Sequence, residues 1–189
     1  MDQASLLHFL CTQLNRLNIG YFITGSHATI VYGDVRFTND IDVVIDVSPA
    51  DLEAFCTAFP EEDFYLSLPA ARQALADRGM FNIIHPSSGL KIDVIIAKDT
   101  LFNRSRMNRS VRFSIADDCE ARFSSPEDII VQKLQWHQMG GGERHLEDIR
   151  GVLKRQEEKL DRQYIAEQAD SQNVLDLWVA ILKEVKDDG

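Results

Sequence analysis

The sequence predicts an α+β fold, in which residues 1–123 form a small mixed sheet with helices and residues 124–189 form a C-terminal helical subdomain. Short apolar or alternating segments, separated by Gly, Pro, Ser and Asn, recur up to residue 123 and are typical of strands and turns. After residue 124, apolar residues recur at helical spacing. The composition agrees, because 44% hydrophobic and 26% charged residues among 189 are typical of a globular domain with a sizeable core.

Each element is expected from a local signal. Leucines at helical spacing predict a first helix over 6–17, which Asn18 and Gly20 end. Strands are expected at 21–24, 41–47, 80–84, 91–97, 111–115 and 120–123, the last four forming two hairpins. Further helices are expected at about 27–32, 49–59, 69–78 and 126–138, and then, after the linker of three glycines at 140–142, from 143 to the C-terminus. Ser48-Pro49 and Ser125-Pro126 are typical helix starts.

Charge and cysteine content exclude several classes of protein. Thirty acidic and twenty basic residues give a net charge of −10, so the surface as a whole does not attract nucleic acid or an anionic membrane, and a polyanion would need a local basic patch. The longest stretch without charge, residues 17–33, contains too many polar residues and glycines for a membrane span. No basic segment precedes an apolar run at the N-terminus, and three scattered cysteines (Cys11, Cys56 and Cys119) do not suggest disulfides. We therefore expect a cytoplasmic protein.

The strand at 41–47 carries acidic residues on one face. Its apolar β-branched residues at odd positions form the other face, whereas Asp40 and Asp42 point together to the first. Aspartate is depleted in strands and like charges repel, so two on one face indicate a metal site rather than a solvated surface. Asp46 shares this face at the strand end, where a plain surface role is favoured. On a later strand, Asp93 points away from the apolar face of Ile92, Val94 and Ile96. If the two strands are neighbours, the three carboxylates converge on Mg²⁺, with two ions expected.

A possible phosphate site precedes these acids. In Gly25-Ser26, glycine allows a close backbone approach, the following helix start offers free N–H groups, and the Ser26 hydroxyl adds a donor. Ser26 could equally serve as an ordinary helix cap. Arg36 and Thr38 precede Asp40 in a polar loop, where Arg36 is either solvated or available to phosphate. A phosphate site beside a metal site fits a nucleoside triphosphate, which supplies ligands for both.

These residues resemble a known pattern. Gly25-Ser26, followed thirteen residues later by Asp40-Ile41-Asp42, with Asp93 on a further strand, is similar to the pattern of the DNA polymerase β-like nucleotidyltransferase superfamily. The resemblance covers residues 21–97. It implies a polymerase β-like core in which Gly25 and Ser26 hold phosphates, Asp40 and Asp42 bind metal, and Asp93 completes the metal site and activates the acceptor as general base.

The C-terminal part resembles a narrower family. The segment 125–134, followed by Arg144 and Glu147-Asp148-Ile149, is similar to the C-terminal helices of bacterial AbiEii-type nucleotidyltransferases, many of which are toxins of toxin–antitoxin or phage-defence systems. The resemblance implies that Lys133 and Asp148 join the nucleotide site. From the residues alone, Lys133 could equally be a side chain that extends its amine to solvent. His137 and His145 do not match a zinc pattern.

Residues 98–112 are the candidate acceptor surface. They contain five basic residues and one acidic residue, which gives +4 in a chain of −10; the basic residues are Lys98, Arg104, Arg106, Arg109 and Arg112. This segment could bind RNA phosphates, or it could be a solvated face that pairs with the acidic C-terminal helices.

The hypothesis is therefore Mg²⁺-dependent transfer of a nucleoside monophosphate from an NTP to an acceptor, with RNA or tRNA modified by a toxin as the first expectation. One alternative is nucleotidylation of a small molecule of the antibiotic type. Another is a binding module on the same fold, such as an antitoxin that neutralises a toxin partner.

Overall fold

The computed structural model describes residues 1–34 and 38–187, which form two compact units. The first unit contains residues 1–27 and 38–124, and the second contains residues 28–34 and 125–187. The helix α2 (Gly25–Tyr32) therefore begins in the first unit and ends in the second. Among the described residues, no helix is both long enough and apolar enough to cross a membrane.

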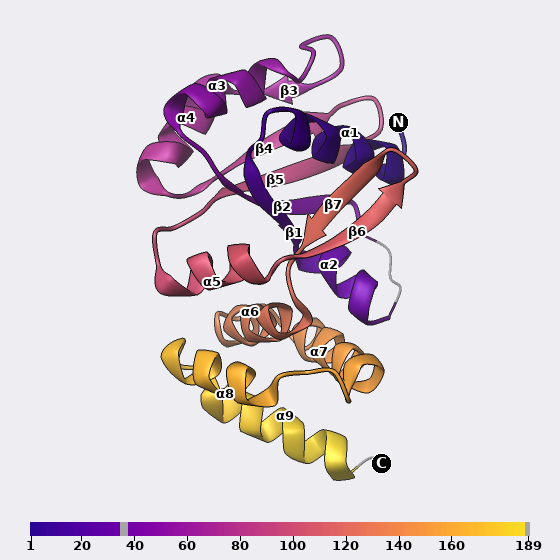
Figure 1. Cartoon of the computed structure of the whole chain (residues 1–189), viewed down its shortest axis with the longest axis vertical. Coiled ribbons are helices and arrows are strands. Elements are labelled where there is room, and N and C mark those ends of the chain that lie inside the picture. The colour runs from indigo at the N-terminus through magenta and orange to yellow at the C-terminus, as the bar shows by residue number, and fades with distance from the viewer. Residues whose placement is uncertain (35–37, 188–189) are drawn as a thin grey trace. The chain divides into compact units, whose positions relative to one another are not determined.

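The first unit is built on a seven-stranded mixed sheet (Figure 1). Its strands lie in the order β3-β4-β5-β2-β1-β7-β6. Their bounds are β1 Gly20–Thr24, β2 Asp40–Asp46, β3 Tyr65–Leu66, β4 Met80–His85, β5 Leu90–Ile96, β6 Val111–Ala116 and β7 Cys119–Phe123. The central strand β2 runs antiparallel to β1 and parallel to β5. The predicted mixed sheet and both hairpins are thus confirmed, and β3 is a short strand that the sequence did not indicate.

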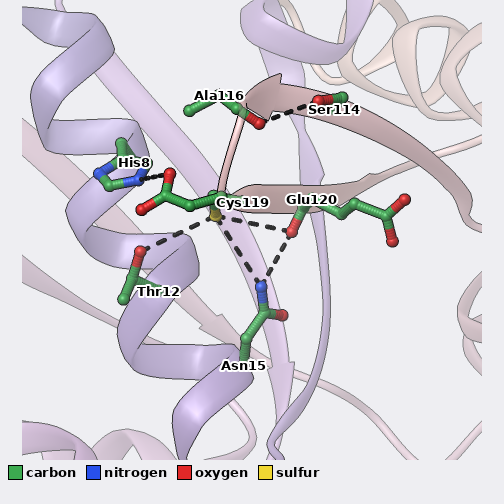
Figure 2. Close-up of polar contacts among 8 residues, drawn as sticks. His8, Thr12, Asn15, Ser114, Ala116, Cys119 and Glu120 are labelled. Atoms are coloured by element: carbon green, nitrogen blue, oxygen red, sulfur yellow. Dashed lines mark hydrogen bonds and ion pairs between the residues drawn. The ribbon is translucent and has the colours of Figure 1, made fainter.

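Four more helices belong to this unit, namely α1 Gln3–Arg16, α3 Pro49–Thr57, α4 Leu68–Asp77 and α5 Leu101–Arg109. Each begins at a residue whose side chain accepts a backbone N–H, as Ser48 does in a capping box with Asp51. Helix α4 packs on β4 and β5, and α1 packs on β7 (Figure 1). Figure 2 shows the polar side of the second contact, where Asn15 of α1 donates to the Glu120 carbonyl of β7 over 2.9 Å.

The cysteines behave as the sequence suggested. Cys11, Cys56 and Cys119 are buried free thiols. Burial raises the pKa of Cys11 to about 12 and that of Cys56 to about 11.

The second unit is a group of helices that includes α6 Pro126–Gln138, α7 Arg144–Gln156, α8 Arg162–Ser171 and α9 Leu175–Asp187. The expected start of α6, with Ser125 as its cap, is confirmed. The expectation of one continuous helical run after residue 143 is wrong, because two turns interrupt it. Asp161 caps a new helix by accepting the Tyr164 N–H, and Asn173 adopts a left-handed conformation with φ of 60°.

Candidate active site

The register of the central strands brings two of the predicted carboxylates together. Strand β5 lies directly beside β2, which is the arrangement that brings the carboxylates of the two strands together. Asp42 and Asp93 are paired at the same level of the sheet. On the other side of β2, Thr24 pairs with Asp42. Asp40 lies two residues earlier on the same face, level with Lys91. Three carboxylates from two parallel strands therefore occupy one end of this face.

Gly25 packs against Asp42. It follows β1 directly and adopts a left-handed backbone conformation with φ of 61°. A Cβ atom at this position would lie 2.0 Å from Oδ2 of Asp42 and 2.7 Å from its Cγ. Glycine is therefore required for two reasons, the positive φ and the carboxylate that fills the space of a side chain. The turn of Gly25-Ser26 therefore lies directly beside the acidic strand β2.

A lysine that the sequence analysis did not assign lies among the carboxylates. Nζ of Lys91 lies 2.9 Å from Oδ2 of Asp93 and 3.8 Å from Oδ2 of Asp40. The hydrogen bond to Asp93 is the largest cause of a raised pKa of Lys91; burial opposes it, and the charges of Asp93, Asp40 and Asp42 add to it. The Lys91 ammonium thus experiences all three carboxylates.

Asn82 completes the surroundings of Asp93. It lies opposite Asp93 in the β4–β5 hairpin and donates through Nδ2 to Asp93 Oδ1. Both oxygens of Asp93 are therefore engaged, one by Asn82 and the other by Lys91. The strand period could have identified Lys91, which is two residues from Asp93 on the same face. The role of Asn82 could be predicted only if the register of the β4–β5 hairpin were known, and the sequence of the four-residue turn does not determine that register.

The chemistry of this set fits a divalent metal. Carboxylate oxygens are the ligands that Mg²⁺ prefers, and here they already surround a cationic ammonium. Asp40 has a side chain 47% exposed, which leaves room for water and phosphate, whereas that of Asp93 is 13% exposed. Within residues 1–34 and 38–187, no three His, Cys, Asp or Glu side chains are gathered closely enough to hold a metal as they stand. A metal at this site would therefore require a rearrangement of side chains, with the backbone register unchanged.

The remaining predicted phosphate residues have separate surroundings. Ser26 is half-buried in the first turn of α2. Thr38 donates to the Asp40 carbonyl over 3.4 Å, and Gln3 donates to the Thr38 carbonyl, so Thr38 fixes the entrance to β2. Arg36 lies outside the described residues.

Lys133 and Asp148 form a buried ion pair within the second unit. The Lys133 ammonium donates to Oδ2 of Asp148, and their side chains are 2% and 7% exposed. Nζ of Lys133 also lies 5.5 Å from the centre of the Trp136 ring. The structure thus brings these two residues together, and a solvent-extended Lys133 is excluded. Nearby, the pKa of His145 is lowered by burial and by the charges of Lys133 and Arg144.

The basic segment is less exposed than the sequence suggested. Arg106 is buried, with its guanidinium carbon 4.7 Å from the centre of the Phe22 ring and Nη2 within 3.4 Å of Thr24 Oγ1. Its placement on an acceptor surface was therefore wrong, because the planar cation stacks on an aromatic ring inside the unit. Arg104 pairs with Asp99 over 2.5 Å, and Arg109 is half-buried. Lys98 and Arg112 are exposed.

Two neighbouring pockets adjoin this segment, with volumes of about 540 and 350 Å³. They share Met107 and Asn108, so we call them together the basic groove. Its basic lining residues are Arg112 and Arg122 in one pocket and Arg78, Lys98 and Arg104 in the other. Its acidic lining residues are Glu120, Asp46 and Asp99. The groove therefore has a net charge of +2 in a chain of −10.

Comparison with known proteins relates this geometry to a known fold. No protein-family model matches the sequence, and no curated protein matches it. Among solved structures, the chain is similar to ANT(2″)-Ia in complex with adenylyl-2″-tobramycin, with a TM-score of 0.59 and 14% identity over 90% of this chain and 97% of that one. It is also similar to an antigenic nucleotidyltransferase-like protein from Paracoccidioides brasiliensis, with a TM-score of 0.53 and 20% identity over 94% and 91% of the two chains.

JHP933 from Helicobacter pylori gives a TM-score of 0.53 with 17% identity, over 90% of this chain and 75% of that one. These identities are too low to transfer a substrate, but the similarity extends over nearly the whole chain. The chain has the fold of the nucleotidyltransferases.

Proposed function

We propose that this protein is a Mg²⁺-dependent nucleotidyltransferase that moves a nucleoside monophosphate from an NTP to an acceptor. The observation that carries the proposal is the direct pairing of Asp42 with Asp93 in parallel strands, with Gly25 packed against Asp42. Asp40, Asp42 and Asp93 would hold the metal. When bound, Mg²⁺ neutralises phosphate charge and lowers the pKa of an acceptor hydroxyl. The nucleotidyltransferase fold supports the same reaction class.

The chain's own residues supply binding and proton transfer. Backbone N–H groups after Gly25 and the Ser26 hydroxyl would orient the β- and γ-phosphates at the start of α2. An acceptor oxygen attacks the α-phosphorus while the bond from that phosphorus to the bridging oxygen breaks, which releases pyrophosphate. The acceptor proton passes to Asp93, held by Asn82. Catalysis of this kind depends mostly on position and charge.

The resemblance to the AbiEii-type family also assigns Lys133 to nucleotide binding. Lys133 is paired with Asp148 and its side chain is 2% exposed, so a contact of Lys133 with phosphate would require its ammonium to become accessible. Arg36, which precedes Asp40 in the sequence, is the other cation that we propose for phosphate.

For the acceptor, we propose RNA, because the basic groove lies away from the acids along the sheet and an extended polymer can reach both. The groove includes Gly20 and Asp46, which pair at one end of the β1–β2 ladder, whereas Thr24 and Asp42 pair at the other end. Four residues of strand separate the two ends by about 13 Å. An RNA could contact the groove through its phosphates and still reach Asp93. In this proposal the protein acts as a toxin that modifies RNA or tRNA.

A small-molecule acceptor is the second candidate, and one comparison favours it. ANT(2″)-Ia, whose structure contains adenylyl-2″-tobramycin, aligns with 90% of this chain. A cationic acceptor would also be attracted by a chain with a net charge of −10.

The test is transfer of label from each α-³²P NTP with Mg²⁺ to cell RNA, cell protein or tobramycin. Asp42→Asn should abolish transfer, since it removes a charge from the paired carboxylates. Asp63→Asn, which changes an exposed aspartate outside both the acidic strand and the groove, should retain it. Label in RNA supports the first acceptor, and label in tobramycin supports the second. Label in protein would indicate an antitoxin or toxin partner. Equal transfer by the wild type and Asp42→Asn would contradict the proposed site.

A further inference from the structure

The position of Lys91 suggests a role that the fold and the reaction class do not assign. Lys91 precedes Asp93 by two residues on β5, so both side chains lie on the same face of the sheet. It is also the register partner of Asp40 on β2. Its ammonium thus lies between the carboxylates of two strands, 2.9 Å from Asp93 and 3.8 Å from Asp40.

Carboxylates that lie this close repel one another unless a cation is present. In the described structure, the Lys91 ammonium supplies such a charge at Oδ2 of Asp93. The other oxygen of Asp93 accepts from Asn82, which is neutral and can remain bonded while Oδ2 changes its partner. A divalent ion that binds Oδ2 would lie next to the ammonium, so repulsion between the two cations favours displacement of Lys91.

Lys91 is able to leave. Its side chain is 34% exposed and has four rotatable bonds, so the ammonium can move to water or to the phosphates of a bound nucleotide. Asp93 is fixed more firmly, with 13% exposure and a bond from Asn82 on the neighbouring strand.

We infer that Lys91 is an internal counter-ion that occupies the cation position between Asp40 and Asp93 and is displaced when a divalent metal binds. This inference rests on the proposed metal site, whose identity it deepens. It makes Lys91 a positioning residue that competes with the metal and keeps Asp93 engaged until the metal is present.

Titration of the full-length protein with Mn²⁺ by calorimetry tests this competition. Lys91→Met removes the ammonium and keeps much of the side-chain length, so Mn²⁺ should bind about tenfold more tightly, which corresponds to about 1.4 kcal/mol. Lys98→Met, which removes an exposed lysine just beyond the other end of β5, should bind Mn²⁺ like the wild type. A merely structural ion pair would leave the affinity unchanged or weaken it, and either result in Lys91→Met would overturn the inference.

The wild-type protein provides a second measurement that does not depend on the folding of a variant. Lysine acetylation, read by mass spectrometry, should proceed faster at Lys91 once Mn²⁺ is added, while the rate at Lys98 stays constant. An unchanged rate at Lys91 under Mn²⁺ saturation overturns the inference but not the metal site. Absence of Mn²⁺ binding in both the wild type and Lys91→Met contradicts the metal site itself and the inference with it.

Discussion

Replacing Gly25 with alanine introduces two unfavourable effects at once. The first is backbone strain, since a non-glycine residue in the left-handed region costs about 1–2 kcal/mol. The second is a steric conflict, because the new Cβ would lie 2.0 Å from Oδ2 of Asp42 and ordinary contact begins at 3.4 Å. The carboxylate would have to move by about 1.4 Å.

Gly89 offers a matched control for the strain alone. It also has a positive φ, 70°, but nothing lies within 4 Å of a Cβ placed there. Gly89→Ala should therefore lose about 1–2 kcal/mol of unfolding free energy. Gly25→Ala should lose roughly 1–3 kcal/mol more, as expected for overpacking.

The displaced carboxylate should also reduce activity. A displacement of about 1 Å at a reacting centre can reduce a rate by about 100-fold, so Gly25→Ala should reduce nucleotidyl transfer by at least that factor. Gly89→Ala should retain activity. Urea denaturation measures the first effect, and label transfer from NTP measures the second. Equal losses of stability in the two variants, or full activity in Gly25→Ala, would contradict the steric conflict between residue 25 and Asp42.

Two further predictions concern the second unit. Lys133→Met should lower the unfolding free energy by about 3–5 kcal/mol, because it leaves Asp148 charged and buried. As a control, Glu184→Gln removes the more exposed Arg150–Glu184 pair and should lower it by about 0–1 kcal/mol. Similar urea midpoints in the two variants would contradict a large contribution from the buried pair. The lowered pKa of His145 means that the folded state favours the neutral ring, so its stabilising contribution is present above pH 6.5 and is lost as the pH falls through the folded pKa. Urea midpoints from pH 8 to 5 should therefore decline less steeply in His145→Gln than in the wild type, and parallel profiles would exclude this contribution.

Much of the fold follows from local signals in the sequence. The alternation in β2 predicts that Asp40 and Asp42 share a face, because side chains on a strand repeat every two residues. Ser48 and Ser125 predict helix starts because their hydroxyl groups accept a free backbone N–H. These features need no knowledge of the tertiary structure, and the structure confirms them.

Other features depend on contacts that a sequence pattern does not contain. The hydrogen bond from Asn82 to Asp93 depends on the register of β4 against β5. The buried ion pair of Lys133 with Asp148 depends on the packing of α6 on α7. The burial of Arg106 depends on Phe22, which is distant in sequence. The break before α9 depends on the left-handed conformation of Asn173, which asparagine tolerates but does not impose.

Calorimetry tests, without knowledge of the acceptor, whether the paired carboxylates bind a metal-associated nucleotide. Each Mg²⁺–NTP complex would be titrated into the wild type and into two variants, Asp42→Asn and Asp46→Asn. Each variant removes one charge from the same face of β2. We predict binding of at least one nucleotide, unchanged affinity in Asp46→Asn, and an affinity at least about tenfold weaker in Asp42→Asn with the urea midpoint preserved. Equal affinity in the wild type and Asp42→Asn would contradict the assignment of this site.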